Sequence, residues 1–249
     1  MSVTISFSGK KVLVTGAGSG IGRALCKRLH VDGAKVYALS KSPEKLESLR
    51  EECPGIETIC VDLESWDATR EALKDLEVVD CLVNNAALAT EENFMNTTPD
   101  NFDKIINVNV KSVINTSQIV VQKMIDNNQG GSIVNISSLG SRFPVRTATS
   151  YALSKASLDM LTKSMAVEFG PKNIRVNGVN PGIIMTPMGK QFYEKEPGIS
   201  VMNRVLGRTP LGRLCEVDEV LNTVLFLLSD AAPMIHGEQI FLDGAYSHC

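Results

Sequence analysis

The sequence predicts an α/β protein in which helices cover both faces of one seven-stranded, doubly wound parallel sheet. Short β-branched runs alternate with longer segments of helical periodicity along the chain. Most of these runs are nearly continuous in apolar residues, which is typical of strands that helices cover on both faces. The alternation of the two kinds of segment favours parallel strands joined by helical crossovers.

The predicted elements follow one another with little interruption. Apolar, β-branched runs predict strands over residues 11–15, 36–39, 57–61, 81–84, 132–136, 175–179 and 239–242. Helical periodicity predicts helices over roughly residues 21–32, 43–51, 66–76, 99–126, 151–169 and 216–228. The stretch 186–213 is the least patterned. Its three prolines and mixed charges predict a long irregular connection, of the kind that often forms an active-site lid.

Length and composition fit a single folded domain over residues 1–249. Apolar residues make up 43% and charged residues 21% of the chain, which excludes a disordered protein. The net charge is −3 and no stripe of Lys and Arg stands out, which argues against nucleic-acid binding. No apolar run approaches the roughly 18 residues that a membrane span needs.

The six cysteines are interpreted as reduced thiols of a cytoplasmic protein. A chain of this length does not need disulfides, and no two cysteines form a CxxC pair. The three histidines lack zinc-ligand spacing, so no metal site is predicted. No signal peptide is evident near residue 1.

A glycine-rich turn follows the first predicted strand and leads into the first predicted helix. It reads TGAGSGIG over residues 15–22, a TGxxxGxG pattern rather than GxGxxG. Glycines let the backbone approach a pyrophosphate, and the helix N-terminus offers free N–H groups and the positive end of its dipole. A tight turn alone would explain some of these glycines, but their position favours nucleotide binding. The expected contacts come from Gly16, Ser19, Gly20, Ile21 and Gly22.

The end of the second strand indicates which nucleotide is bound. Where NAD-binding folds often carry an acidic residue for the ribose 2′-hydroxyl, this chain has Ser40, Lys41 and Ser42. Lys41 would meet a 2′-phosphate, with hydroxyl groups beside it, so NADP(H) is the predicted cofactor. The alternative is that Lys41 is only a solvated surface charge.

Further cofactor contacts are expected after the third and fourth strands. Asp62, beside Leu63, would accept a hydrogen bond from the adenine amino group, or else only cap its turn. Asn85 and Ala86 would let the cofactor lie close and would pin the loops, although taken alone they are ordinary turn residues.

Tyr151 and Lys155 lie four residues apart at the start of a predicted helix, so their side chains share one face. An ammonium group and a positive nicotinamide would favour the phenolate and lower a phenol pKa that is ordinarily near 10. A YxxxK pair is common and mostly structural, so its meaning depends on context. Ser138 ends the fifth predicted strand, where ligands of α/β sheets bind, and Tyr151 follows 13 residues later.

The order of these motifs resembles that of the short-chain dehydrogenase/reductase family over nearly the whole chain. The matching motifs are TGAGSGIG, NNAA, Asn109, Ser138, Tyr151-x-x-x-Lys155 and Asn180-Pro181-Gly182. The resemblance implies a single-domain Rossmann fold and a hydride passed from a nicotinamide to a carbonyl carbon. It implies that Tyr151 donates the proton, that Ser138 hydrogen-bonds the carbonyl oxygen, and that Lys155 binds the ribose and lowers the Tyr151 pKa.

The same resemblance implies roles for residues outside this trio. Asn109 would hold a water in a proton relay at a break in the long helix 99–126, the alternative being a polar residue that merely bends the helix. The nicotinamide carboxamide and the phosphate would be met by Pro181, Gly182, Ile184 and Thr186.

Several stretches resemble the dicarbonyl/L-xylulose reductase branch of that family: residues 52–57, 60–63, 158–163 and Cys249. That resemblance implies reduction of L-xylulose, other small sugars or α-dicarbonyls with NADPH, and a homotetramer. Ser19 stands where the branch tends to carry a basic residue, so the 2′-phosphate would depend more on Lys41. The substrate is expected to be contacted by Ser138, Leu139, Val145, Ala148, Tyr151 and Tyr193.

Leu139 and Ala148 replace amide and imidazole side chains of the branch, so an apolar or smaller dicarbonyl fits as well as a sugar. A reductase of 3-oxoacyl or steroid ketones is the near alternative, with specificity set by residues 186–213. A non-catalytic NADP-sensing protein is the distant alternative, because such proteins typically lack the Tyr or the Lys.

The helix 151–169 carries more than one apolar stripe, which fits a second buried face against a partner subunit.

Overall fold

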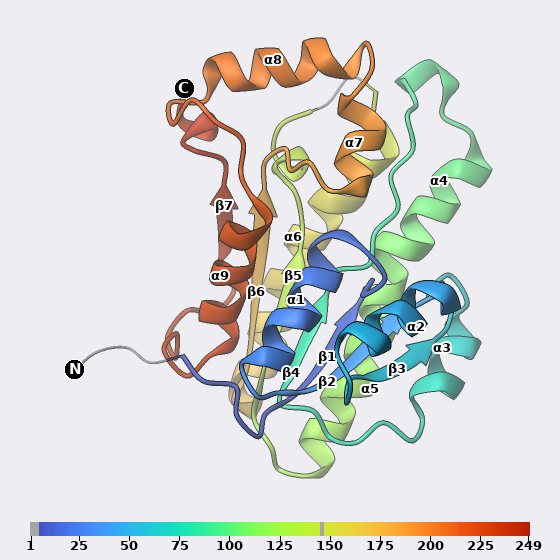
Figure 1. Cartoon of the computed structure of the whole chain (residues 1–249), viewed down its shortest axis with the longest axis vertical. Helices are drawn as coiled ribbons and strands as arrows, with labels where there is room; N and C mark the ends of the chain where they lie inside the picture. Colours follow the sequence, from blue (N-terminus) through green and yellow to red (C-terminus); the bar gives the residue numbers. More distant parts are fainter. Residues whose placement is uncertain (1–4, 145–146) are drawn as a thin grey trace.

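The computed structural model describes residues 5–144 and 147–249 and shows one sheet of seven parallel strands (Figure 1). The strands are β1 (Lys11–Thr15), β2 (Lys35–Ser40), β3 (Glu57–Cys60), β4 (Cys81–Asn84), β5 (Gly131–Ile136), β6 (Ile174–Pro181) and β7 (Gln239–Leu242). Their order is β3-β2-β1-β4-β5-β6-β7, so the chain winds outward from β1 in one direction and from β4 in the other. The predicted doubly wound sheet is confirmed, and the strand ends differ by at most two residues.

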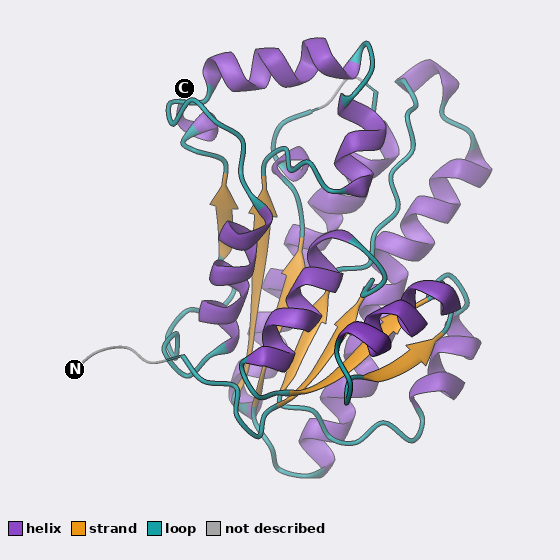
Figure 2. Cartoon of the chain, in the orientation of Figure 1, coloured by secondary structure: helices purple, strands orange, loops and turns teal. Residues whose placement is uncertain are grey.

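Helices cover both faces of the sheet (Figure 2). One face packs against α1 (Gly20–Val31), α2 (Pro43–Glu52) and α9 (Val217–Leu228). The other packs against α3 (Trp66–Leu73), α5 (Ser112–Asp126) and α6 (Thr149–Phe169). The remaining helices are α4 (Pro99–Ile106), α7 (Pro187–Tyr193) and α8 (Gly198–Arg208), of which α7 and α8 lie beyond the carboxyl ends of the strands, at the top of Figure 1. Within the described ranges, no helix has the length and apolar character needed to cross a bilayer.

Neighbouring residues of each central strand supply the two apolar layers. In β1, Val12 and Val14 belong to the core formed with α1 and α9, whereas Leu13 belongs to the core formed with α5 and α6. All three side chains are fully buried. A strand covered on both faces needs an apolar residue at every position, which is why these runs are continuous in the sequence.

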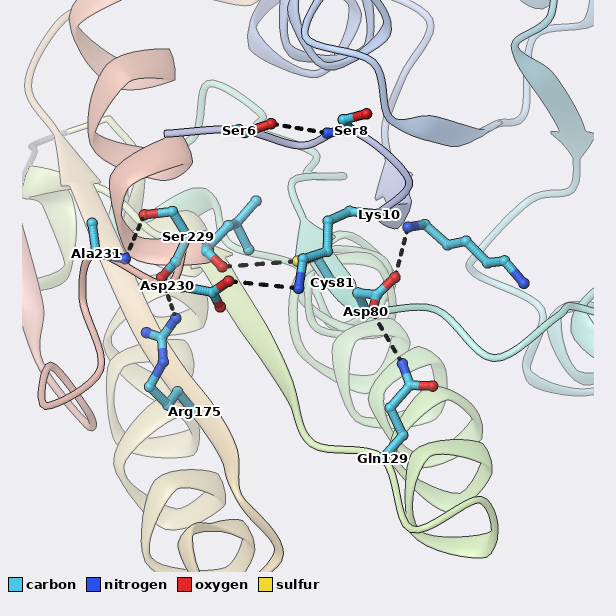
Figure 3. A network of polar contacts seen from close by, with 12 residues as sticks. Ser6, Ser8, Lys10, Asp80, Cys81, Gln129, Arg175, Ser229, Asp230 and Ala231 are labelled. Carbon is cyan, nitrogen blue, oxygen red and sulfur yellow. Dashed lines mark hydrogen bonds and ion pairs between the residues drawn. The ribbon is translucent and has the colours of Figure 1, made fainter. Parts of the chain in front are cut away.

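Polar contacts tie the amino ends of the strands together, at the edge of the sheet opposite the carboxyl ends (Figure 3). Asp80, just before β4, accepts hydrogen bonds from the Lys11 backbone N–H at 2.8 Å and from Gln129 Nε2 at 3.3 Å. Arg175 of β6 donates to the carbonyl oxygen of Ser229, after α9, at 3.0 Å. These hydrogen bonds stabilise the amino ends of the strands, opposite the loops that follow their carboxyl ends.

One prediction about the helices is confirmed and another needs correction. The helix predicted over 99–126 is divided into α4 and α5 by a π turn at Asn107–Lys111, as the break implied by the family resemblance requires. The irregular connection predicted over 186–213 instead contains α7 and α8. Pro187 occupies the first turn of α7, where its missing N–H costs nothing, and Pro197 is the N-cap of α8. Two of the prolines that suggested a loop thus stand at helix starts.

Candidate active site

A cavity of about 550 Å³ lies at the carboxyl ends of the strands. Its wall begins with the glycine-rich turn after β1, continues along the loops after β2, β3, β4, β5 and β6, and reaches α7 and α8. The turn after β1 and the loop after β4 flank the point where the strand order reverses, which is where doubly wound sheets bind ligands.

Most of the predicted site residues line this cavity. The cofactor set comprises Gly16, Ser19, Gly20, Ile21, Ser40, Lys41, Asp62, Leu63, Asn85, Ala86, Pro181, Gly182, Ile184 and Thr186. The catalytic and substrate set comprises Ser138, Leu139, Ala148, Tyr151, Lys155 and Tyr193. Gly22 and Asn109 are buried and are not part of the lining. Val145 lies outside the described residues.

The glycine-rich turn is shaped by close backbone contacts. Gly16 has a φ of 69°, and a Cβ there would lie 2.8 Å from the Ala86 Cα. A Cβ on Gly22 would lie 2.4 Å from the Gly16 carbonyl oxygen, so Gly22 allows α1 to pack onto the turn and does not itself contact the cavity. Ser19 caps α1 without a side-chain hydrogen bond, which leaves the first N–H groups of the helix to a ligand.

Asn85 ties the loop after β4 to this turn. Its Nδ2 donates to the Thr15 carbonyl oxygen at 2.9 Å and its backbone N–H donates to Thr15 Oγ1 at 3.0 Å. The Ala86 N–H donates to the same hydroxyl oxygen at 3.1 Å. The predicted pinning of the two loops is therefore present in the structure.

Lys41 and Asp62 lie together at the end of the cavity formed by the loops after β2 and β3. Lys41 Nζ lies 3.6 Å from Asp62 Oδ2, and both side chains are about half exposed. The other Asp62 oxygen accepts the Glu64 backbone N–H at 3.1 Å, so this carboxylate caps its own turn. Lys45, in the first turns of α2, also lines the cavity and escaped the sequence analysis. Its only sequence signal is its place three residues after Ser42, the N-cap of α2.

Ser138, Tyr151 and Lys155 meet at the other end of the cavity. Lys155 Nζ lies 5.6 Å from the Tyr151 ring centroid and donates to the Ile136 carbonyl oxygen at 2.8 Å. Ser138 Oγ accepts the Gly140 N–H at 3.0 Å, so its own O–H can donate, and the Tyr151 phenol lies close enough to interact with it. The strand end, the turn after it and the first turns of α6 thus bring together a hydroxyl, a phenol and an amine.

Burial is the main cause of the pKa shifts of Tyr151 and Lys155. Loss of hydration raises the pKa of Tyr151 to about 12, and the Ser138 hydroxyl opposes this shift only in part. The expected lowering of the Tyr151 pKa involves Lys155 together with the positive nicotinamide, so it stays a prediction for the protein with its cofactor bound. Burial also lowers the pKa of Lys155 to about 8, against the opposing charge of Asp159.

Asn109 lies in the π turn, and its side chain makes three hydrogen bonds. Its Oδ1 accepts the Leu88 N–H at 2.7 Å, while Nδ2 donates to the Leu88 carbonyl oxygen and to Ser154 Oγ, each at 2.9 Å. The side chain thus joins the loop after β4 to α6. Since both of its N–H groups are already used, a water held by Asn109 would donate to one of its oxygen atoms, and the proton relay stays a prediction.

The substrate end of the cavity is largely apolar and aromatic. Leu139 and Ala148 line this end, as expected from the sequence. Tyr193, which was expected to contact the substrate, and its neighbour Phe192 contribute to the lining from α7. Lining residues that the sequence analysis missed are Phe143, Val201, Arg204 and Tyr246. They come from segments far apart in the chain, so no local motif marks them.

Comparison with known proteins places the chain in a family. The family model described as enoyl-(acyl carrier protein) reductase matches residues 16–247. The chain is 46% identical over 242 residues to carbonyl reductase (NADPH) 2 of Sus scrofa and to L-xylulose reductase of Homo sapiens, in each case over 97% of this chain and 98% of the relative. It resembles the crystal structure of a putative 2-deoxy-D-gluconate 3-dehydrogenase from Agrobacterium tumefaciens with bound NADP, at a TM-score of 0.89, 28% identity and full coverage of both chains.

Fold, site and relatives together define an NADP(H)-dependent oxidoreductase. The chain belongs to the short-chain dehydrogenase/reductase family.

Proposed function

We propose that this chain reduces small carbonyl compounds, either sugars or α-dicarbonyls, with NADPH. The observation that carries the proposal is that Ser138, Tyr151 and Lys155 line the same cavity as the glycine-rich turn. Relatives that are 46% identical over nearly the whole chain are named for carbonyl and L-xylulose reduction, which supports the substrate class.

The cavity fits a dinucleotide. Gly16 and Gly20 line its wall at the glycine-rich turn, and the N-terminus of α1 reaches the cavity beside them through Ile21. The pyrophosphate would lie there, the ribose would lie against Lys155, and the nicotinamide would lie against the segment 181–186. When bound, NADPH supplies a hydride to the carbonyl carbon of the substrate.

Tyr151 and Ser138 would act on the carbonyl oxygen. The Ser138 hydroxyl, able to donate, would hydrogen-bond this oxygen as negative charge develops on it. Tyr151 would then give its phenol proton to the oxygen, which yields the alcohol and leaves a phenolate. A pKa of about 12 keeps Tyr151 protonated at neutral pH, so the buried phenol is set up to donate a proton, as reduction requires.

The function is tested by mixing the protein with NADPH or NADH and following the absorbance of the reduced nicotinamide. The substrates are diacetyl, L-xylulose, L-sorbose, a 3-oxoacyl thioester and a steroid ketone. We expect turnover of at least one dicarbonyl or sugar, faster with NADPH than with NADH. If only the thioester or the steroid is reduced, the second candidate holds, a reductase of larger ketones, which the apolar surroundings of Leu139 and Ala148 favour.

Lys41→Ala is expected to raise the KM for NADPH by about tenfold, the effect of one lost hydrogen bond to a charged group, and to leave the KM for NADH within about twofold. Lys45→Ala is expected to act in the same direction, because Lys45 lines the same end of the cavity. Steady-state kinetics with both nucleotides measures the effect. Lys74→Ala is the matched control, since Lys74 is an exposed lysine that is likewise paired with a carboxylate, Glu71. Equal changes in both KM values would exclude a 2′-phosphate contact.

We also propose a homotetramer in the cytoplasm. Leu153, Met160 and Val167 follow one another at seven-residue spacing along α6 and are 51%, 63% and 83% exposed. An apolar stripe of this kind on a helix that also packs on the sheet supports a subunit interface. The six free thiols support a reducing compartment. Sedimentation equilibrium would give the mass, and a monomer at micromolar concentration would contradict the tetramer.

A further inference from the structure

The helix that carries Tyr151 and Lys155 has no capping side chain of its own. Its N-cap is Ala148, which offers no oxygen to the free N–H groups of the first turn. The Ser150 N–H, at the second position of the helix, instead donates to Glu92 Oε1 at 3.1 Å. The cap of α6 is thus supplied by a residue 58 positions earlier in the chain.

Glu92 is a buried carboxylate that the proposed mechanism does not use. Only 7% of the residue is exposed. Its second oxygen accepts a hydrogen bond from Asn101 Nδ2, and the same amide donates to Thr90 Oγ1 at 2.9 Å. The Glu92 backbone N–H donates to the Thr147 carbonyl oxygen at 3.0 Å. Backbone and side chain together therefore fix the chain just before and just inside the start of α6.

Within residues 5–144 and 147–249, this contact is one of two hydrogen-bonded links between the loop after β4 and α6. The other is Asn109, which links Leu88 to Ser154. Ser150 and Ser154 lie on either side of Tyr151, and Ser154 Oγ donates to the Tyr151 carbonyl oxygen at 2.7 Å. Between its two attachment points the loop lines the cavity with Leu88, Ala89, Thr90 and Glu91. The loop that forms the cavity wall is thus bonded to the helix turn on both sides of Tyr151.

We propose that Glu92 is a positioning residue for proton transfer: its carboxylate caps the first turn of α6 and holds Tyr151 at the cavity. The inference rests on the proposed role of Tyr151. A carboxylate is suited to this place because it accepts an otherwise free N–H and complements the positive end of the helix dipole. Proton transfer depends steeply on the position of the donor, and a displacement of about 1 Å can reduce the rate about 100-fold.

The test compares two isosteric replacements in the full-length protein. Glu92→Gln keeps an oxygen acceptor for the Ser150 N–H, and the Asn101 amide can turn over to face the new NH₂ group. Glu92→Met has a side chain of similar length but no such acceptor. Reductive kcat, the KM for NADPH and the thermal midpoint are measured for both. Ser65→Ala is the matched control, because Ser65 is not part of the cavity lining and caps α3 by accepting the Ala68 N–H.

Glu92→Met is expected to lower kcat about 10- to 100-fold with the KM for NADPH within about twofold. Glu92→Gln is expected to retain kcat within about threefold. Ser65→Ala is expected to lower the thermal midpoint by about 2–4 °C, like the loss of any helix cap, without changing kcat. A general loss of structure would lower stability and nucleotide affinity together, and the conservative variant would not rescue kcat selectively.

Wild-type kcat in Glu92→Met would overturn the inference, as would equal losses in the Met and Gln variants. If Glu92→Met does not fold, Glu92→Asp takes its place: the carboxylate is then one methylene too short for Ser150, and an unchanged kcat would overturn the inference. Absence of carbonyl reduction in the wild-type protein would instead refute the proposed function, so the two failures are distinguishable.

Discussion

Tyr151→Phe is expected to lower kcat for carbonyl reduction by about 10³-fold and to leave the dissociation constant for NADPH within about twofold. Removing the phenol oxygen takes away the group that is proposed to give its proton to the carbonyl oxygen of the substrate. General acid catalysis by one positioned side chain is worth about 10²- to 10⁴-fold. The ring remains and continues to fill its place in the cavity wall, so the cofactor end is unaffected.

The measurement is steady-state turnover of NADPH with diacetyl, together with fluorescence titration of NADPH binding. Tyr37→Phe is a suitable control, because Tyr37 is a buried tyrosine on β2 that is not part of the cavity lining. It should retain wild-type kcat. A Tyr151→Phe enzyme with more than about a tenth of wild-type kcat would refute the proton-donor role.

Lys155→Met is expected to have the second largest effect, lowering kcat about 10²- to 10³-fold and also weakening NADPH binding. Both changes follow because the ammonium is proposed to hold the ribose and to support the charge that forms on Tyr151. The combination distinguishes this variant from Tyr151→Phe, in which only kcat falls. Because Lys155 is buried and donates to the Ile136 carbonyl oxygen, circular dichroism must first show that the variant is folded. Unchanged NADPH affinity in a folded variant would remove Lys155 from the cofactor site.

The pH dependence of the wild-type enzyme tests the same lysine without a substitution. Burial lowers the pKa of Lys155 to about 8, so its charge is present below that pH and lost as the pH rises through it. Tyr151, with a pKa raised to about 12, keeps its proton over the same range. We therefore expect kcat to be level below about pH 7 and to fall above about pH 8 at saturating NADPH and diacetyl. A level profile up to pH 10 would show that the ammonium is not needed.

Much of the fold could be predicted because its signals are local. Each central strand is apolar at successive positions, as Val12, Leu13 and Val14 illustrate, and the glycine-rich turn has a spacing that few other structures require. The pair Tyr151 and Lys155 could be placed on one face of a helix from spacing alone. Ser138 needed only the position of a strand end. In each of these cases the information lies within about 15 residues of chain.

The remaining features depend on contacts between distant segments. Pro187 and Pro197 suggested an irregular loop because a proline at a helix start has the same local appearance as one in a loop. The Tyr151 pKa moves upward because the phenol is buried, and the extent of burial cannot be deduced from the spacing of Tyr151 and Lys155. No sequence motif marks Glu92, because the helix that it caps lies in another part of the chain.

In the proposed reaction, this chain transfers a hydride from NADPH to a carbonyl carbon while Tyr151 protonates the oxygen. The most direct test follows deuterium from NADPH labelled at C4 of the nicotinamide into the product formed from diacetyl, by mass spectrometry. We expect an acetoin product one mass unit heavier when the transferred C4 position is labelled, formed by the wild-type protein at least about 10²-fold faster than by Tyr151→Phe. NADPH oxidation that gives no deuterated alcohol, with either C4 position labelled, would contradict the proposed reaction.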